Sequence, residues 1–131
     1  MPRAGSFKSV ESIARTLPDV EVGTAWGKPA VRVRGKMFAC MASHKSAEPN
    51  TLVVMTDFTS RDALLADAPD IYYIKPHYVK HPCVLVRLSR IRPDALHDLI
   101  AGAYHFMRPQ GRGTGVQTKG RLKAASTSRR R

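Results

Sequence analysis

The stretch AVRVRGKMFACMAS at residues 30–43 constrains the fold of this chain most, because its alternating side chains predict a β-hairpin. Gly35 and Lys36 separate two alternating runs, and a Gly-X pair is typical of a two-residue type II′ turn. Such a turn places Arg34 opposite Met37 and decides which side chains share a face, since side chains alternate with period two. One predicted face carries Val31, Val33, Phe38 and Cys40, and the other carries Arg32, Arg34, Met37, Ala39 and Met41.

The two faces of the predicted hairpin have different roles. We expect Val33 and Phe38 to face the core and Arg34 to face away from it. Arg32 and Arg34 have two interpretations: they form the solvated side of a half-exposed antiparallel sheet, or they are contacts for an anion.

Charge is distributed unevenly along the 131 residues. Residues 1–107 contain 14 Lys and Arg against 10 Asp and Glu, whereas residues 108–131 contain 8 basic residues and no acidic residue. The net charge of +12 therefore divides into +4 and +8. Because the second segment lacks apolar periodicity and is rich in Gly and Arg, we expect one folded domain at residues 1–107 and a basic tail that is disordered when free.

Hydrophobic spacing predicts the remaining elements. An amphipathic helix begins after Ser6 and continues to Leu17, where Pro18 ends it. Strands follow one another without crossover helices, which implies a largely antiparallel sheet packed against helices on one face, a two-layer α+β domain. The other predicted elements are strands at Val20–Trp26, Thr51–Thr56 and Val84–Leu88, a short helix capped by Thr59 or Ser60 that continues through Ala66, and a helix at Pro93–Met107.

Two sets of side chains can be placed in advance. In the short helix we expect Leu64 and Leu65 to face inward. Arg61 and Asp62 are expected to face solvent. Trp26, the one tryptophan of the chain, is either a core anchor or a stacking surface for a base, and we expect the core because Trp is highly buried on average.

The segment Ile71–Pro82 holds three of the four tyrosines together with two histidines and two lysines. This mixture of aromatic and basic residues has three interpretations. It is a nucleic-acid contact, it lines a small-molecule pocket, or its tyrosines mark the boundary where a sheet meets water.

Compartment and metal content can also be anticipated. The chain has no apolar run of the roughly 18 residues that span a bilayer, and its first ten residues lack the apolar stretch of a signal peptide, so we expect a cytoplasmic protein. Cys40 and Cys83 have no Cys or His partners at zinc-finger spacing. We expect two reduced, partly buried thiols, no metal and no cofactor.

The sequence offers one pair for nucleophilic catalysis, Cys83 with His81 or His77. No local pattern supplies the carboxylate that would orient such a base. His77 and His81 have the four-residue spacing of helical metal ligands, but Pro76 and Pro82 bracket them and disfavour a helix. We therefore expect neither a catalytic residue nor a metal ligand, and no enzymatic activity.

Several segments between residues 7 and 107 together resemble one known family. The segments are Leu17-Pro18-Asp19-Val20, Trp26-Gly27-Lys28-Pro29-Ala30, Val33-Arg34-Gly35-Lys36-Met37-Phe38-Ala39, Arg61-Asp62-Ala63-Leu64-Leu65, His77-Tyr78 and Val84-Leu85-Val86-Arg87-Leu88. In this combination the chain resembles the MmcQ/YjbR-like family. It departs from the family pattern at Ala103-Tyr104, where relatives often have Ala-Trp, and at Arg108-Pro109-Gln110, where they have Ala-Pro-Lys.

The resemblance implies a small cytoplasmic bacterial protein with an antiparallel sheet packed against helices, a fold compared with that of secretion chaperones. The family is described as DNA-binding, with two hairpin wings as the contacts, and the resemblance implies no cofactor. The basic tail lies outside the family pattern, so the resemblance implies nothing about it.

We expect a nucleic-acid-binding module that contacts phosphates more than bases. The partner is expected to be DNA with weak sequence preference, bound by a monomer or weak dimer. The expected contacts in the domain are Arg32, Arg34, Lys36, Lys75, Lys80 and Arg87. The expected contacts in the tail are Arg108, Arg112, Lys119, Arg121, Lys123, Arg129, Arg130 and Arg131.

Two other functions remain open. In the first, the sheet face or an exposed apolar patch binds a peptide or a second copy of the chain, with no role in nucleic-acid binding. In the second, Trp26 and the cluster between Tyr72 and Tyr78 bind a small molecule, which requires a closed pocket lined by Trp26 or Tyr73.

Overall fold

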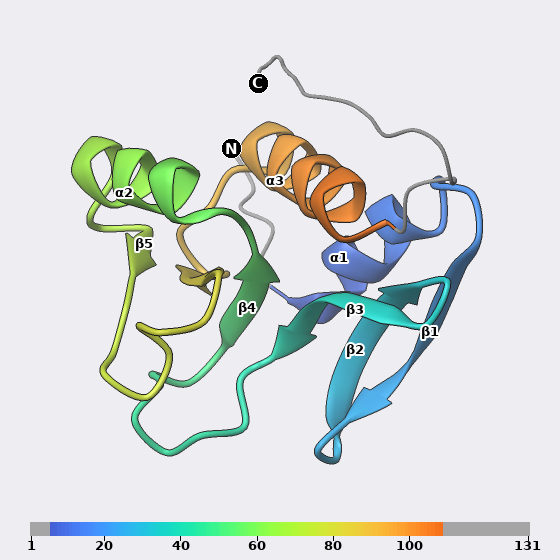
Figure 1. Ribbon diagram of the computed structural model, residues 1–131, viewed down its shortest axis with the longest axis horizontal. Helices are drawn as coiled ribbons and strands as arrows, with labels where there is room; N and C mark the ends of the chain where they lie inside the picture. Colours follow the sequence, from blue (N-terminus) through green and yellow to red (C-terminus); the bar gives the residue numbers. More distant parts are fainter. Residues whose placement is uncertain (1–5, 109–131) are drawn as a thin grey trace.

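The computed structural model describes residues 6–108, which form three helices and a six-stranded sheet (Figure 1). All strand pairs are antiparallel, in the order β1-β2-β3-β4-β6-β5. The predicted two-layer α+β domain is therefore confirmed. The elements are α1 (Phe7–Ala14), β1 (Val20–Ala25), β2 (Lys28–Val33), β3 (Lys36–Met41), β4 (Thr51–Met55), α2 (Phe58–Asp67), β5 (Tyr72–Tyr73), β6 (Cys83–Arg87) and α3 (Pro93–Met107).

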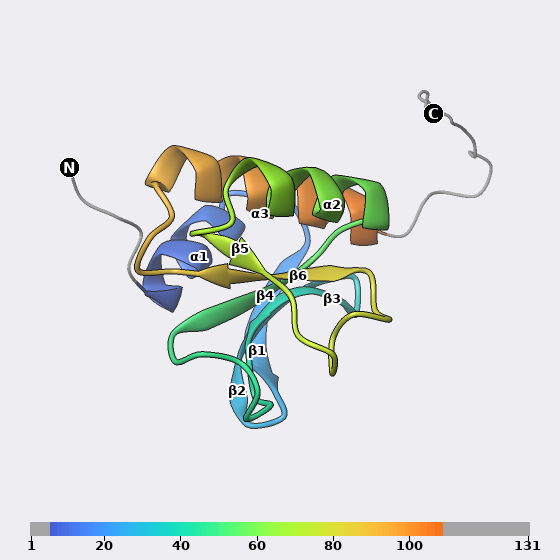
Figure 2. The same cartoon turned by 90° about the vertical axis from the view of Figure 1, so that its left-hand side faces the viewer.

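The three helices lie on the same side of the sheet (Figure 2). Helix α3 packs on β3, β4 and α1, while α2 packs on β5 and β6. The main core lies between these layers, and Leu96, Ile100 and Ala103 contribute the apolar stripe of α3. Tyr104 meets the ring of Phe38 edge-on, with centroids 5.7 Å apart, and its hydroxyl donates to a backbone carbonyl 2.7 Å away.

The hairpin of β2 and β3 forms, but its turn begins one residue earlier than predicted. Arg34 and Gly35 form the turn with φ of 49° and 83°, the pattern of a type I′ turn, and Val33 pairs with Lys36. Val33 therefore pairs with Lys36 instead of Phe38, a shift of two residues along β3. Because side chains alternate faces with period two, a shift of two residues leaves each side chain on its predicted face. Val33 and Phe38 are fully buried and Arg34 is exposed, as expected.

A β-bulge changes the second half of the hairpin. Arg32 pairs with Met37 but Val31 pairs with Ala39, which leaves Phe38 as the extra residue. The bulge reverses the faces of the residues that follow it. Ala39 therefore lies in the helix-side core with Phe38, and Cys40 lies on the opposite face, the reverse of the expected placement.

Helix α2 differs from the prediction at its start and on one face. Its N-cap is Asp57, whose carboxylate accepts a hydrogen bond from the backbone N–H of Ser60. Arg61 is buried rather than solvent-facing, because its Nη1 donates to the carbonyl oxygens of His81 (3.1 Å) and Cys83 (3.2 Å). Asp62 is exposed, as expected.

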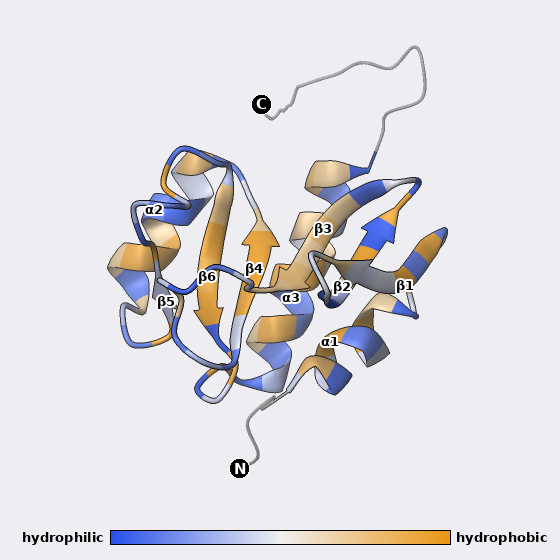
Figure 3. Ribbon diagram, turned by 90° about the horizontal axis from the view of Figure 1, so that it is seen from below, coloured by the Kyte–Doolittle hydropathy of each residue, from blue (hydrophilic) through white to orange (hydrophobic). Residues whose placement is uncertain are grey.

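The sheet face opposite the helices carries a second, smaller buried cluster. The segments 42–50 and 74–82 lie on this side of the sheet (Figure 2), and we call the face with these two segments the loop face. Figure 3 looks toward it and shows hydrophobic residues along β4 and β6. The cluster is formed by Ala25, Ala30, Cys40, Val53, Tyr73, Tyr78, Cys83 and Leu85. Within residues 6–108, no helix is long and apolar enough to cross a membrane.

Candidate functional site

A pocket of about 570 Å³ opens on the loop face, between the sheet and the two loop segments. Its floor comes from alternate residues of neighbouring strands, where Cys40 pairs with Val53 and Met55 pairs with Cys83. The lining residues include no carboxylate. They are Trp26, Met37, Cys40, Ser43, His44, Val53, Met55, His77, Tyr78, His81 and Cys83.

Trp26 lies at this pocket and not in the core, so the core placement expected for it is wrong. Its side chain is 75% exposed. Trp26 and Gly27 form the turn between β1 and β2 with φ of 52° and 77°. Gly is favoured at such positive φ values because it has no Cβ, and Asn is tolerated there because its short polar side chain bonds locally to the backbone. Neither packing nor turn geometry therefore explains why a tryptophan occupies this position.

Two stacked imidazoles form another part of the pocket lining. The rings of His44 and His77 are 3.7 Å apart at an interplanar angle of 10°, and Tyr78 meets both edge-on. Nδ1 of His44 accepts a hydrogen bond from the backbone N–H of Ser46, so the proton of the neutral ring is on Nε2. Partial burial lowers the pKa of His44, and the neighbouring His77 and Lys45 lower it further. His44 is therefore neutral at neutral pH.

The two cysteines at the pocket floor are free thiols, as expected. Cys40 on β3 and Cys83 on β6 are separated by β4, a spacing of about 10 Å that exceeds the reach of a disulfide. Burial raises the pKa of each thiol to about 11, so both are protonated at neutral pH. The Cys83 thiol donates to the carbonyl oxygen of Tyr78 at 3.8 Å. Protonated thiols are poor nucleophiles and poor metal ligands.

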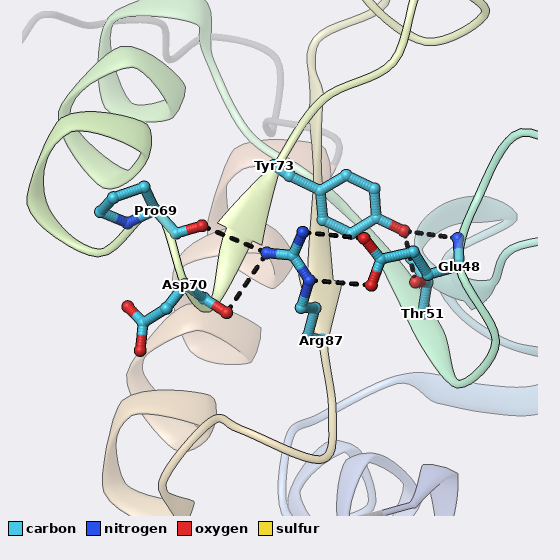
Figure 4. Close-up of polar contacts among 6 residues, drawn as sticks. All are labelled: Glu48, Thr51, Pro69, Asp70, Tyr73 and Arg87. Atoms are coloured by element: carbon cyan, nitrogen blue, oxygen red, sulfur yellow. Dashed lines mark hydrogen bonds and ion pairs between the residues drawn. The ribbon is translucent and has the colours of Figure 1, made fainter.

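Arg87, at the end of β6, is held by several groups at once (Figure 4). Its Nε and Nη2 donate to the carboxylate of Glu48 at 2.9 and 2.8 Å, and its guanidinium lies 4.3 Å from the ring centroid of Tyr73. Nη1 donates to the carbonyl oxygens of Pro69 and Asp70. The hydrogen bond from Arg87 lowers the pKa of Glu48 and raises that of the guanidinium.

The Tyr73 hydroxyl completes this contact between loop and sheet. It accepts from the backbone N–H of Glu48 at 2.8 Å and shares a 2.6 Å hydrogen bond with the hydroxyl of Thr51 (Figure 4). The segment 42–50 is thereby fixed against β5 and β6. Arg87 and Tyr73 act first as structural residues, because they hold one wall of the site in place.

The cations expected in the domain do not form a single patch. Arg32 and Arg87 share the loop face, but β3 and β4 lie between them, and Arg32 Nη2 donates to the carbonyl oxygen of Thr24. Arg34 in the hairpin turn pairs with Asp19 at 3.1 Å.

Four other expected cations lie within the described residues, at the ends of elements or in the segment 74–82. Lys36 begins β3 and is exposed beside the hairpin turn. Lys75 and Lys80 lie in the segment 74–82, where the Nζ of Lys75 is 5.9 Å from the Tyr73 ring centroid. Arg108 caps α3. The tail residues Arg112, Lys119, Arg121, Lys123, Arg129, Arg130 and Arg131 lie outside the described residues.

The fold also brings two lysines outside the set expected from the sequence to the same side as Lys80. Lys28 follows the Trp26 turn and Lys45 follows His44, and both are exposed. In the sequence, Lys28 and Lys45 lie close to an aromatic or imidazole side chain. The sequence does not show that these side chains are exposed, because their exposure depends on how the loops fold.

Acidic residues are segregated from this face. All ten carboxylates of the chain fall within the described residues, and two of them, Glu21 and Glu48, lie on the loop face. The other eight lie on the helices or in the segments that flank them: Glu11, Asp19, Asp57, Asp62, Asp67, Asp70, Asp94 and Asp98. Among residues 6–108, no group of three or more His, Cys, Asp or Glu side chains is arranged to hold a metal ion.

Comparisons with known proteins support the resemblance seen in the sequence. Two uncharacterised mycobacterial proteins, Rv2570 of Mycobacterium tuberculosis and Mb2600 of Mycobacterium bovis, are each 30% identical over 86 residues, 66% of this chain and 67% of theirs. The fold is similar to a crystal structure of Deinococcus radiodurans protein DR2400, described with a DUF419 domain, with a TM-score of 0.65 and 18% identity over 79% of this chain and 78% of that one. The YjbR family model matches residues 15–106, and the chain therefore belongs to the YjbR family.

Proposed function

We propose that this chain binds nucleic acid, with DNA as its partner, through the loop face of the sheet. The observation that carries the proposal is the segregation of charge. Besides Arg87, which is paired with Glu48, five cations lie on the loop face with two carboxylates, whereas eight carboxylates lie on the helix side. A polyanion is attracted to such a face, whereas on the opposite side the carboxylates offset cations such as Lys8, Arg15 and Arg92. The five cations are Lys28, Arg32, Lys45, Lys75 and Lys80.

The kind of cation favours phosphate contacts over base reading. Lys28, Lys45 and Lys80 are exposed lysines, which act as flexible point charges and not as planar forks for a base edge. Contacts of this kind position a strand without reading its sequence, so the proposal includes weak sequence preference. Arg34 and Arg87 contribute less, because carboxylates already pair with both.

The proposal assigns binding and no catalysis to this face. Cys83, the one candidate nucleophile, has a pKa raised to about 11 by burial, and its thiol donates to a carbonyl oxygen instead of to a histidine. The proposed place of action is the cytoplasm, where DNA and reduced thiols are both found.

The test compares two triple variants of the full chain with the same loss of charge. Lys28→Ala/Lys45→Ala/Lys80→Ala neutralises the loop face. Lys8→Ala/Arg15→Ala/Arg92→Ala neutralises three exposed cations of the helix side. Affinity for a fluorescent DNA is measured by anisotropy at several salt concentrations, beginning near about 50 mM.

The loop-face variant is expected to lose at least about tenfold in affinity, and its log affinity is expected to fall less steeply with log salt, by about one unit of slope for each lost phosphate contact. The helix-side variant should remain close to the unmodified chain. Equal losses in the two variants would contradict the proposal, and so would an unmodified chain without measurable affinity at low salt.

A second candidate function is the binding of a peptide or a second copy of the chain on the helix side. It is favoured by the groove between α2 and α3, which Leu64, Leu99 and Phe106 line, and by the 43% exposure of Phe106. Sedimentation of the chain and of Phe106→Ser at increasing concentration tests the self-association form of this candidate. Association that Phe106→Ser abolishes would support it.

A further inference from the structure

Phosphate contacts by lysines leave the loop-face pocket and its exposed tryptophan without a role. We propose that this pocket accepts one heteroaromatic ring that carries a neighbouring phosphate, the base of an unstacked nucleotide. The inference rests on the proposed function for the class of ligand, and it deepens that function by making an unpaired base, rather than a duplex, the preferred partner. A free nucleotide and an unpaired position in a strand share this chemistry.

The floor of the pocket suits a flat apolar ring. Its volume of about 570 Å³ falls within the usual range of small-molecule sites. Four of its eleven lining residues carry sulfur, and the polarisable sulfur atom makes favourable contacts with aromatic rings. These four are Met37, Cys40, Met55 and Cys83.

Trp26 supplies a stacking surface at the rim of this floor. A large apolar side chain that is 75% exposed at a φ of 52° stabilises neither the core nor its own turn. Exposed aromatic side chains stack on bases of any sequence, because every base has a π face. The position of Trp26 is therefore explained by a planar ligand that covers its ring.

The histidines supply polar groups for the edge of such a ring. His44 is neutral and carries its proton on Nε2, because its Nδ1 accepts from the backbone N–H of Ser46. His77 is stacked on His44 at 3.7 Å, and His81 lines the same pocket. The Nε2–H of His44 can donate a hydrogen bond to an acceptor on the edge of a base, and the ring nitrogens of His77 and His81 add further polar atoms.

Charge around the pocket selects an anionic ligand over a cationic one. None of the eleven lining residues is a carboxylate. Lys28, Lys45 and Lys80 each lie within two residues of a lining residue, namely Trp26, His44 and His81. A phosphate attached to a base in the pocket would therefore lie among cations, whereas an aromatic amine would be repelled.

Trp26 makes the test direct, because it is the only tryptophan and its fluorescence reports on its own stacking. The full chain is titrated with adenosine 5′-monophosphate, with ribose 5-phosphate and with an oligodeoxyadenylate strand of about 12 nucleotides. Calorimetric titrations of Trp26→Ala follow, since that variant has lost the reporter. Phe106→Ala is the matched control, because Phe106 is another exposed aromatic residue but lies on the helix side.

We expect saturable quenching by the nucleotide and by the strand but not by ribose 5-phosphate. Trp26→Ala should weaken the binding of both ligands by about tenfold, the order expected for one lost stacking contact, and Phe106→Ala should not. Because Trp26 is exposed, an unchanged far-ultraviolet spectrum is expected for Trp26→Ala. If Trp26→Ala is unfolded, the fluorescence of the unmodified chain tests the pocket instead: quenching by the nucleotide but not by ribose 5-phosphate supports it, and no quenching overturns it.

The outcomes separate this inference from the proposed function. Nucleotide binding without strand binding supports the pocket and overturns the proposed nucleic-acid function. Salt-dependent strand binding that neither quenches Trp26 nor weakens in Trp26→Ala overturns the pocket and leaves the proposed function standing. Equal effects of ribose 5-phosphate and the nucleotide also overturn the pocket, because the ring would not be recognised. Absence of binding by all three ligands overturns both.

Discussion

Trp26 combines a positive φ, which strains the backbone, with a largely exposed side chain that adds little stability to the core. Asn tolerates the left-handed region better than Trp, so Trp26→Asn is expected to leave the free energy of unfolding unchanged or to raise it by up to about 1 kcal/mol. Trp26→Val is the control, because a β-branched residue is strained at this φ and should lower stability. Urea denaturation measures both. A loss of more than about 1 kcal/mol for Trp26→Asn would show that Trp26 serves the fold.

Arg61 is a cation that serves structure and not ligand binding. Its side chain ties α2 to the segment before β6 through hydrogen bonds to the carbonyl oxygens of His81 and Cys83. Arg61→Ala leaves both acceptors without this donor and is expected to lower the free energy of unfolding by about 2 to 3 kcal/mol. Asp62→Ala, its exposed neighbour on the same helix, should change stability by less than about 0.5 kcal/mol. Equal effects of the two substitutions would contradict the structural role of Arg61.

The ion pair that attaches the segment 42–50 to β6 makes the free energy of unfolding depend on pH in the acid range. The hydrogen bond from Arg87 lowers the pKa of Glu48 below its ordinary value of 4.5, so the unfolded chain binds this proton more readily than the folded chain does. The stability from this pair is therefore present above about pH 4.5 and is lost as the pH falls through the lowered folded pKa. The expected result is a smaller acid-induced loss of stability in Glu48→Gln than in the unmodified chain.

Urea denaturation at about pH 6 and about pH 3.5 measures this difference, because the first value lies above 4.5, where the stabilisation is present, and the second lies below it, where the unfolded chain already binds the proton. Asp62→Asn is the control variant and should retain the acid sensitivity of the unmodified chain. Identical pH dependence in Glu48→Gln and the unmodified chain would mean that the ion pair does not stabilise the segment.

Whole elements were predictable where one face of the pattern is clearly apolar. The stripe of α3 and the continuous apolar run of β4 both predicted elements that the structure confirms. The hairpin shows why register is harder to predict. Phe38, Ala39 and Cys40 are three consecutive apolar residues, so the pattern is the same with or without a bulge, and packing against two cores decides which face each residue occupies.

The candidate site was less predictable than the fold, because it depends on loops that meet only in three dimensions. The average burial of tryptophan predicted a core position for Trp26, and nothing local to the chain marks its turn as part of a site. His44 and His77 stack although more than thirty residues separate them in the sequence. Arg61 was expected to face solvent because the carbonyl groups that it binds belong to a distant segment.

For the molecule as a whole, we expect the basic tail to contribute to DNA affinity but not to the stability of the domain. Deleting residues 109–131 removes seven cations and no apolar stripe, so the melting temperature should remain nearly unchanged. If the tail neutralises about five phosphates, log affinity for DNA falls against log salt with a slope of about −4 to −5, and the deletion should remove most of that slope. A drop of several degrees in melting temperature would show that the tail docks on the domain.

The most direct test of binding at the loop face is to find which face of the molecule a nucleic acid touches. Amide signals of the full, isotope-labelled chain are followed by nuclear magnetic resonance during titration with a single-stranded DNA of about 12 nucleotides. Binding at the loop face predicts that the largest shifts fall in the Trp26 turn and in the segments 42–50 and 74–82, while the exposed amides of α1 and α3 remain unchanged. Shifts centred on α1, α2 and α3, with the loop face silent, would contradict it.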